Sequence, residues 1–204
     1  MKKLAVVLAA LLVAFSSMAQ SSYNRISLSY SPHKVSSEGE TADIDGLMLS
    51  YTRGFSLTSS APLYLEVGLL GNFMMKSSST TWSIGSQVIS SSESTLAMLR
   101  LIAPVNVTYR IPLGGKVTLA PYAGLNITAN VMGKNKYTQN GVTEETNILD
   151  NSDVNIIQLG FQAGAGFNFG KFYAGAGYMG DITSMGKKTT ETIGGLVISL
   201  GYTF

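Results

Sequence analysis

The last nine residues of the chain, Leu196–Phe204, alternate with a strict period of two. Every even-numbered position carries a large apolar or aromatic side chain, and the positions between them are mostly small or polar. This is the period of a β-strand with one apolar and one polar face. Such a strand at the end of a chain would be an aggregation-prone edge unless the sheet closes on itself. The pattern therefore predicts a closed barrel whose apolar face meets lipid.

Seven further segments alternate in the same way, and no stretch has a convincing helical period. The eight predicted strands cover about residues 24–31, 46–53, 63–74, 96–111, 117–132, 154–169, 172–182 and 190–204. Short connections alternate with longer ones, and the longer ones are residues 32–45, 76–94, 133–153 and 183–189. Short turns at one end and long loops at the other are typical of outer-membrane barrels. The sequence thus predicts an all-β fold, an eight-stranded antiparallel up-and-down transmembrane β-barrel, with both termini in the periplasm.

The first 19 residues have the features of a cleaved signal peptide. Lys2 and Lys3 form its basic start, and Leu4–Phe15 is its apolar stretch, which is too short to cross a bilayer as a helix. A small-residue site then predicts cleavage before Gln20. Residues 20–204 are expected to form one outer-membrane β-barrel domain.

Composition excludes several classes of protein. The absence of Cys rules out disulfides, thiolate metal sites and a lipoprotein anchor. Lys2 and Lys3 account for 2 of the 14 basic residues, so the mature chain carries 12 basic and 12 acidic residues, and no nucleic-acid partner is expected. Gly175–Gly180 matches the G-x-G-x-x-G pattern, but it lies within a period-two strand instead of opening a helix. No cofactor and no metal site are predicted.

An eight-stranded barrel is just wide enough to be filled by its own side chains. The polar faces of the predicted strands place a charged and amide cluster inside it: Arg25, Glu66, Arg100, Arg110, Gln158 and Gln162. Buried charges must be paired. Glu66 and Arg110 lie near the same end of adjacent strands, so we predict a contact between them, with Arg25 nearby. A packed polar plug is the favoured interpretation, and an ion path or gate is the alternative.

Proline and glycine carry two further expectations about strand geometry. Pro104 and Pro121 lie in mid-strand, where each removes a ladder hydrogen bond, so a local bulge is predicted at each. The repeated inward glycines are explained by the large inward side chains of Tyr64, Tyr122 and Tyr173. A bulky ring in a narrow barrel needs a space opposite it.

The third long connection contains Asn140–Gly141, a strong signal for a two-residue hairpin turn. With that turn, Gln139 faces Val142 and Lys136 faces Glu145, whose opposite charges suit cross-strand neighbours. This connection is therefore predicted to rise as a β-ribbon beyond the membrane. Such a ribbon offers an edge to a partner strand.

Two single residues are candidate functional positions. Trp82, in the Ser- and Thr-rich segment 76–94, is a candidate surface contact for a partner. His33 is the sole histidine and lies at the outer end of the first strand, where small outer-membrane enzymes keep a catalytic His beside Ser, Asp or Glu. The acids considered as its partners are Glu38, Glu40, Asp43, Asp45 and Asp181. A solvated loop is the favoured interpretation, because no local signature fixes a nucleophile.

Short motifs resemble a known family. Leu101–Arg110 resembles the E-I-P-L-L-L-K-Y strand of PorT-like outer-membrane β-barrel domains, although it lacks the usual Glu before Ile-Pro, and Pro121–Leu125 resembles their P-Y-x-G-x-G strand. The C-terminal Leu200, Tyr202 and Phe204 resemble the insertion signal read by the barrel-insertion machinery. The resemblance implies a small barrel of OmpX-like shape. It implies no activity, because the family is functionally heterogeneous.

The combined interpretation is a bacterial outer-membrane barrel with a structural or surface-interaction role and no enzymatic activity. Its expected partners are outer-membrane lipid, the insertion machinery and an extracellular protein or glycan. Three alternatives remain: an enzyme acting on lipid or peptide through His33, a secreted barrel that holds a small apolar ligand, and a narrow conducting pore. The secreted barrel requires Leu200, Tyr202 and Phe204 to point inward, so their orientation separates it from the membrane protein.

Overall fold

The computed structural model describes residues 22–204 except 38–39, 85–86, 140, 152 and 188–189. The predicted signal peptide, residues 1–19, lies outside the described residues. The described part of the chain is mostly β-strand, with one short 3-10 helix, η1 (Ile148–Asp150). Within that part, no helix has the length and apolar character needed to cross a membrane.

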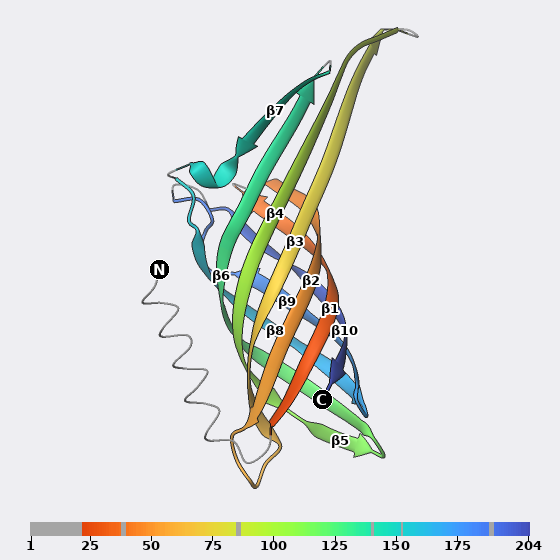
Figure 1. Cartoon of the computed structure of the whole chain (residues 1–204), viewed down its shortest axis with the longest axis vertical. Coiled ribbons are helices and arrows are strands. Elements are labelled where there is room, and N and C mark those ends of the chain that lie inside the picture. The colour runs from red at the N-terminus through yellow and green to blue at the C-terminus, as the bar shows by residue number, and fades with distance from the viewer. Residues whose placement is uncertain (1–21, 38–39, 85–86, 140, 152, 188–189) are drawn as a thin grey trace.

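Eight strands form a closed antiparallel ring (Figure 1). The strands of the chain are β1 (Ser22–Ser37), β2 (Glu40–Ser56), β3 (Leu63–Ile84), β4 (Gln87–Tyr109), β5 (Ile111–Gly114), β6 (Val117–Gln139), β7 (Val142–Asn147), β8 (Ile157–Phe169), β9 (Phe172–Asp181) and β10 (Thr192–Thr203). The ring runs β1–β2–β3–β4–β6–β8–β9–β10 and returns to β1. Of the other two strands, β5 pairs with β6 beyond the end of β4, and β7 folds back on β6. The predicted eight-stranded up-and-down barrel is confirmed.

The seam between β1 and β10 closes the ring. Ile26 lies opposite Tyr202, and Leu28 lies opposite Leu200. At the end of the seam, the backbone groups of Asn24 and Phe204 exchange two hydrogen bonds of 2.8 Å. The last strand therefore pairs with the first, as its alternation predicted.

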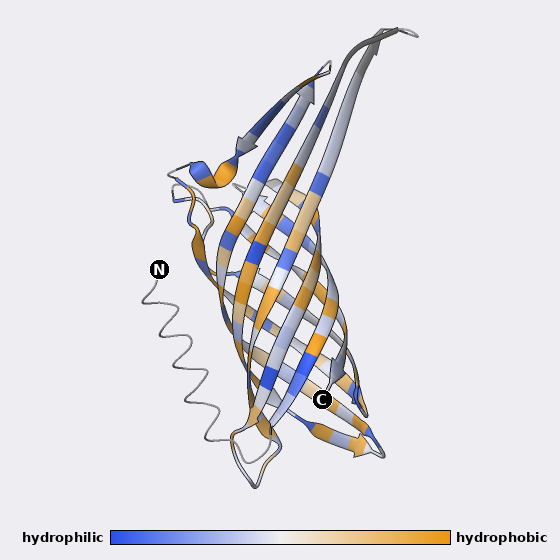
Figure 2. Ribbon diagram, viewed as in Figure 1, coloured by the Kyte–Doolittle hydropathy of each residue, from blue (hydrophilic) through white to orange (hydrophobic). Residues whose placement is uncertain are grey.

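The apolar side chains of the barrel strands point away from the lumen. Leu200, Tyr202 and Phe204 are 67%, 43% and 53% exposed. Figure 2 shows apolar and polar residues alternating along the barrel strands. The secreted ligand-binding barrel, which needs these side chains inside, is therefore wrong.

Glycines make room for the inward rings of Tyr122 and Tyr173, as predicted, but no described glycine lies against Tyr64. A Cβ atom on Gly164 would lie 2.7 Å from the Tyr122 hydroxyl, and one on Gly177 would overlap the same hydroxyl. Gly166 lies against the buried ring of Tyr173, and a Cβ atom there would overlap that ring. Any larger residue at these positions would have to displace the ring that lies against it.

The predicted bulges at the two prolines are wrong. Pro104 lies opposite Asn126 and Pro121 opposite Ala165, each in a continuous register. The pairing of β4 with β3 is interrupted at Pro104 and resumes beyond it in the same register. The N–H group that proline lacks therefore removes hydrogen bonds between the two strands, but no extra residue is inserted and no bulge forms. The register shift between β4 and β6 occurs at Leu99 and Arg100, where no proline is present.

The strands at the extracellular end are longer than predicted. β3 and β4 remain paired over residues 76–84 and 87–94, in a segment that was expected to be a loop, and β1 and β2 do the same through most of segment 32–45. Figure 1 shows β3, β4, β6 and β7 reaching well beyond the rest of the barrel. Both faces of β3 and β4 are polar in this region, with many serines. The sequence there lacks the alternation of apolar and polar residues from which strands are predicted.

Candidate functional site

The lumen is stacked in four layers, alternately polar and apolar. Along β4, the inward residues run from Asn106 through Ile102 and Arg100 to Met98 towards the extracellular end. The lower apolar layer consists of Met48, Leu70, Ile102, Met179 and Val197. The upper apolar layer consists of Ile44, Met74, Met98 and Ile193. The lower polar layer lies on the periplasmic side of the lower apolar layer. The upper polar layer lies between the lower and the upper apolar layers.

The lower polar layer is organised around the carboxylate of Glu66, which is 1% exposed. Arg25 Nη2 lies 3.1 Å from Glu66 Oε2, and the Tyr23 hydroxyl donates a hydrogen bond to Glu66 Oε1. The Arg25 guanidinium also lies over the Tyr173 ring, 4.1 Å from its centroid. The carboxylate is thus paired and hydrogen-bonded, which is the condition for burying a charge.

The predicted contact between Glu66 and Arg110 is wrong. Arg110 follows the end of β4, is half-buried, and lies over the rings of Tyr23 and Tyr64, at 4.5 Å and 5.5 Å from their centroids. Arg25, expected only to be nearby, is the partner of Glu66. Alternation gave the face on which each residue lies, but the partner depends on the tilt of the strands across the barrel.

A cavity of about 60 Å³ lies within this part of the lumen. Its walls include the hydroxyls of Ser27, Ser29 and Ser50. Beside it, Gln162 Nε2 donates to Asn106 Oδ1 at 2.8 Å. A space of this size holds a few water molecules.

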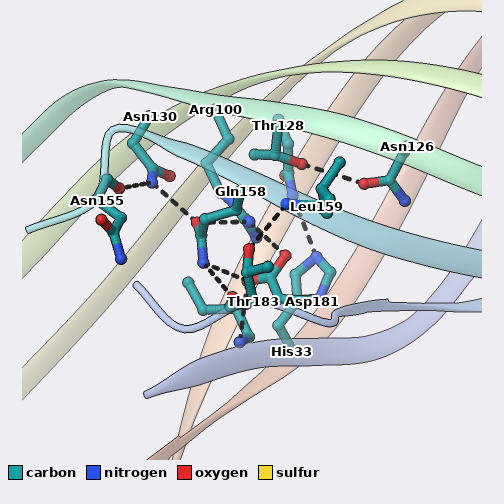
Figure 3. Close-up of polar contacts among 12 residues, drawn as sticks. His33, Arg100, Asn126, Thr128, Asn130, Asn155, Gln158, Leu159, Asp181 and Thr183 are labelled. Carbon is teal, nitrogen blue, oxygen red and sulfur yellow. Dashed lines mark hydrogen bonds and ion pairs between the residues drawn. The ribbon is translucent and has the colours of Figure 1, made fainter. Parts of the chain in front are cut away.

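The upper polar layer contains the second buried ion pair (Figure 3). Arg100 Nη2 lies 2.6 Å from Asp181 Oδ1 and donates to Gln158 Oε1 at 3.2 Å. Gln158 Nε2 and the backbone N–H of Ile193 both donate to Asp181 Oδ2. Asn130 Nδ2 donates to Gln158 Oε1 at 2.9 Å. Sequence reasoning placed Arg100 and Gln158 inside but missed Asp181 as their partner, because Asp181 lies on β9, far from β4 in the ring.

His33 belongs to the upper polar layer and is 2% exposed. Its Nε2 lies 3.1 Å from Asn72 Nδ2, and Asn72 Oδ1 accepts from the Ser31 hydroxyl at 3.4 Å. Of the acids considered as its partners, Asp181 lies in the same polar layer (Figure 3), where Arg100 pairs with it, and Asp43 is exposed on the outer side of the barrel. Glu38 and the side chain of Glu40 lie outside the described part of the chain.

The connection between β7 and β8 and the connection between β9 and β10 pack at the extracellular end of the lumen. Ile148 and Met185 pack on the upper apolar layer. The backbone N–H of Asn155 donates to the Met185 carbonyl at 2.7 Å, and that of Lys187 donates to Asp153 at 2.7 Å, so the two connections are joined to each other. Among the described residues, no group of three or more His, Cys, Asp or Glu side chains is placed to bind a metal ion.

Beyond the rim, four strands form what we call the extracellular sheet. It consists of residues 76–84 of β3, 87–95 of β4, 134–139 of β6 and 142–147 of β7. The predicted register of its second hairpin is confirmed, with Gln139 opposite Val142 and Lys136 opposite Glu145. The ion pair is formed by the diagonal neighbour, since Lys134 Nζ lies 2.6 Å from Glu145 Oε1. The backbone of Trp82 lies in β3, but its side chain is outside the described part of the structure.

A closed ring of antiparallel strands with a lipid-facing apolar surface and a filled polar lumen defines a transmembrane barrel of the bacterial outer membrane. The chain belongs to the outer membrane protein beta-barrel domain family, whose model matches residues 5–204. This places the protein in the outer membrane, as predicted.

Solved structures share the fold at low sequence identity. Neisserial surface protein A is 14% identical with a TM-score of 0.50, over 89% of this chain and 97% of that one. Ail, the attachment invasion locus protein of Yersinia pestis, in complex with the heparin analogue sucrose octasulfate, is 18% identical with a TM-score of 0.49, over 91% and 100%. The outer membrane enzyme PagL is 15% identical with a TM-score of 0.40, over 88% and 98%. No curated protein matches the chain significantly.

Proposed function

We propose that this protein is a non-enzymatic surface-interaction protein, in which a filled barrel holds the extracellular sheet at a fixed position above the membrane. The observation that carries the proposal is the pair of open sheet edges beyond the rim. β2 pairs with β3 only as far as Asp45 opposite Met75. Among the described residues, β3 from 76 to 84 therefore pairs on one side only, with β4, and β7 pairs only with β6.

An open strand edge presents unpaired N–H and C=O groups, which an extended segment of another chain pairs with by adding a strand. Ser and Thr occupy 14 of the 30 positions of the extracellular sheet, and its charges balance at three Lys and three Glu. A balanced sheet does not attract a polyanion strongly. The chemistry available is backbone hydrogen bonding supplemented by hydroxyl groups. This favours an extended segment of an extracellular protein as the partner, with a glycan as the second candidate.

The lumen supports a scaffold role. Both buried arginines are paired with a carboxylate, and an apolar layer lies on the extracellular side of each pair. His33 is buried and contacts Asn72, and the acid of the same layer, Asp181, is held by Arg100, which supports a non-enzymatic role. Within the family, the motifs Leu101–Arg110 and Pro121–Leu125 favour a PorT-like, OmpX-like barrel.

Shortening the β3–β4 hairpin tests the interaction. Ser78 and Ser94 are cross-strand partners, so replacing residues 79–93 with an Asn-Gly turn keeps the hairpin in register. We expect cells that display this variant to adhere less to surfaces coated with collagen, fibronectin or laminin than cells that display the intact chain. A sulfated-glycan surface tests the second candidate.

The matched variant shortens the β6–β7 hairpin instead, with residues 137–144 replaced by Asn-Gly between the partners Lys136 and Glu145. It shows which edge the partner uses, and the mobility of heated and unheated samples on gels verifies that each variant folds. A chain that lacks both hairpin tips and adheres as well as the intact chain would overturn the proposal.

A further inference from the structure

Basic side chains are in excess at the periplasmic end of the barrel. Among the described residues, Glu66 is the one acidic side chain at this end, and Arg25 pairs with it. Four further basic residues lie at the same end: Arg53, Arg110, Lys116 and Lys171. None of these four forms an ion pair with the described residues. The side chains of this end therefore carry a positive charge that the described part of the chain does not compensate.

The two lysines are exposed, whereas each arginine lies against an aromatic ring. The guanidinium of Arg53 is 5.1 Å from the centroid of the Phe55 ring, and that of Arg110 is 4.5 Å from the centroid of the Tyr23 ring. The lysine side chains are thus the cationic groups of this end that are open to a ligand.

Lys116 and Lys171 lie on adjacent periplasmic turns, between β5 and β6 and between β8 and β9. The backbone N–H of Gly170 donates to the Lys116 carbonyl at 2.9 Å, and the N–H of Thr203 donates to the Lys171 carbonyl at 2.7 Å. The stem of Lys116 leans over Gly170, since a Cβ atom there would lie 3.9 Å from Lys116 Cδ. We call Lys116 and Lys171 the lysine pair. Like charges on two adjacent turns repel each other, and an anion that contacts both removes this repulsion.

A row of outward aromatic side chains lies directly on the membrane side of the lysine pair. Phe169 is opposite Phe172, and Phe172 is opposite Tyr202. The three side chains are 52%, 68% and 43% exposed. Lys171 Nζ lies 5.7 Å from the centroid of the Tyr202 ring. Because exposed aromatic rings at the end of a barrel mark the membrane interface, the lysine pair lies at the level of the lipid headgroups of the periplasmic leaflet.

We propose that the lysine pair binds the phosphate of one anionic phospholipid of the periplasmic leaflet, with the acyl chains of that lipid against the aromatic row. A phosphodiester group accepts hydrogen bonds from both ammonium groups at once. The site lies at the opposite end of the barrel from the extracellular sheet and does not depend on the proposed interaction (Figure 1).

The charges also select the headgroup. Phosphatidylethanolamine adds an ammonium group that the two lysines repel. The carboxylate of Glu66 cannot receive that ammonium group, because it is buried and held by Arg25 and Tyr23. Phosphatidylglycerol carries the same phosphate without the ammonium group, so it is the preferred lipid.

Native mass spectrometry of the refolded intact chain in detergent tests the site. The protein is mixed with equal amounts of phosphatidylglycerol and phosphatidylethanolamine that have the same acyl chains. We expect phosphatidylglycerol to be retained in preference. Lys116→Gln and Lys171→Gln should each lower its retention about fivefold, and the double variant should lose the preference altogether. Equal retention of the two lipids by the intact chain would overturn the proposal.

Lys34→Gln is the matched control, because it removes the same charge from an exposed lysine at the other end of the barrel. It should keep the preference for phosphatidylglycerol. If it lost as much as the double variant, total charge would explain the binding and the lysine pair would not be the site. Displacement of the lipid by soluble glycerol phosphate or by peptidoglycan fragments would overturn the assignment to a lipid. The mobility of heated and unheated samples on gels verifies that each variant is folded.

Discussion

Strands β3, β4 and β6 pass through two environments, and an ion pair in each shows how differently the two are held together. In the lumen, the side chains of Arg100 and Asp181 are 3% and 4% exposed. In the extracellular sheet, those of Lys134 and Glu145 are 52% and 53% exposed. Both pairs have the same 2.6 Å separation, so burial and not distance distinguishes them.

The comparison teaches where this protein can tolerate change. A buried charge that loses its partner keeps its full desolvation cost, whereas an exposed charge is rehydrated by water. The lumen is therefore constrained by each of its own side chains. The extracellular sheet is held by its backbone pairing, and its ion pair is exposed to water.

Removing one lumen charge should have the largest effect. Arg100→Met leaves Asp181 buried without its cation, and we expect the free energy of unfolding to fall by about 3–5 kcal/mol. Urea-induced unfolding from lipid vesicles measures this change. Replacing both residues, as Arg100→Met with Asp181→Leu, should recover much of the loss, and Lys134→Met in the sheet should leave the unfolding midpoint unchanged. If Arg100→Met were as stable as the unmodified chain, the buried and the exposed ion pairs would not differ in their contribution to stability.

Filling a glycine space in the lumen should have the next largest effect. Gly166→Ala places a methyl group in the Tyr173 ring, so we expect a loss of about 1–3 kcal/mol in the same unfolding experiment. Combining it with Tyr173→Ala should remove the clash, so that the effect of Gly166→Ala becomes smaller in that background. Gly71→Ala, which has open space beside it, is the control and should be nearly neutral. Equal effects at Gly166 and Gly71 would show that the ring does not require the space.

The smallest effect concerns the protonation of the Glu145 carboxyl in the extracellular sheet. A hydrogen bond from Lys134, together with its charge, holds the pKa of the Glu145 carboxyl below its usual range. A lowered folded pKa means that the stabilisation is present above the usual carboxyl pKa and is lost as pH falls through the lowered value. In an NMR titration of the intact chain, Lys134→Met should return the pKa of Glu145 towards about 4.3. An unchanged titration in that variant would show that the pair does not form in solution.

Much of the barrel could be predicted from the sequence, because lipid imposes a clear period of two. The alternation of residues 196–204 gave the outward face and the seam with β1. The same alternation in the other strands placed five polar residues in the lumen, and all five are buried: Arg25, Glu66, Arg100, Gln158 and Gln162. Inward tyrosines explained the inward glycines in the same way.

What could not be predicted depends on register and tilt. Arg25 on β1 meets Glu66 on β3, and Arg100 on β4 meets Asp181 on β9, so neither partner comes from an adjacent strand. Strand patterns contain no information about such contacts across the lumen. The β6–β7 half of the extracellular sheet was predicted from its turn, but the β3–β4 half was treated as a connection, since a Ser- and Thr-rich strand in water has the same composition as a loop.

The seam between β1 and β10 also affects the order in which the strands pair during folding. The hydroxyls of Ser29 and Ser199 meet at 2.7 Å across 170 positions of the chain, whereas the other pairings of the ring join strands that are near each other in sequence. The chain entropy lost on closing a loop grows with its length, and pairings of high contact order form slowly. Closure should therefore come last. Until Phe204 reaches Asn24, the molecule is an open sheet with two edges of unpaired backbone N–H and C=O groups, which must be shielded from other copies.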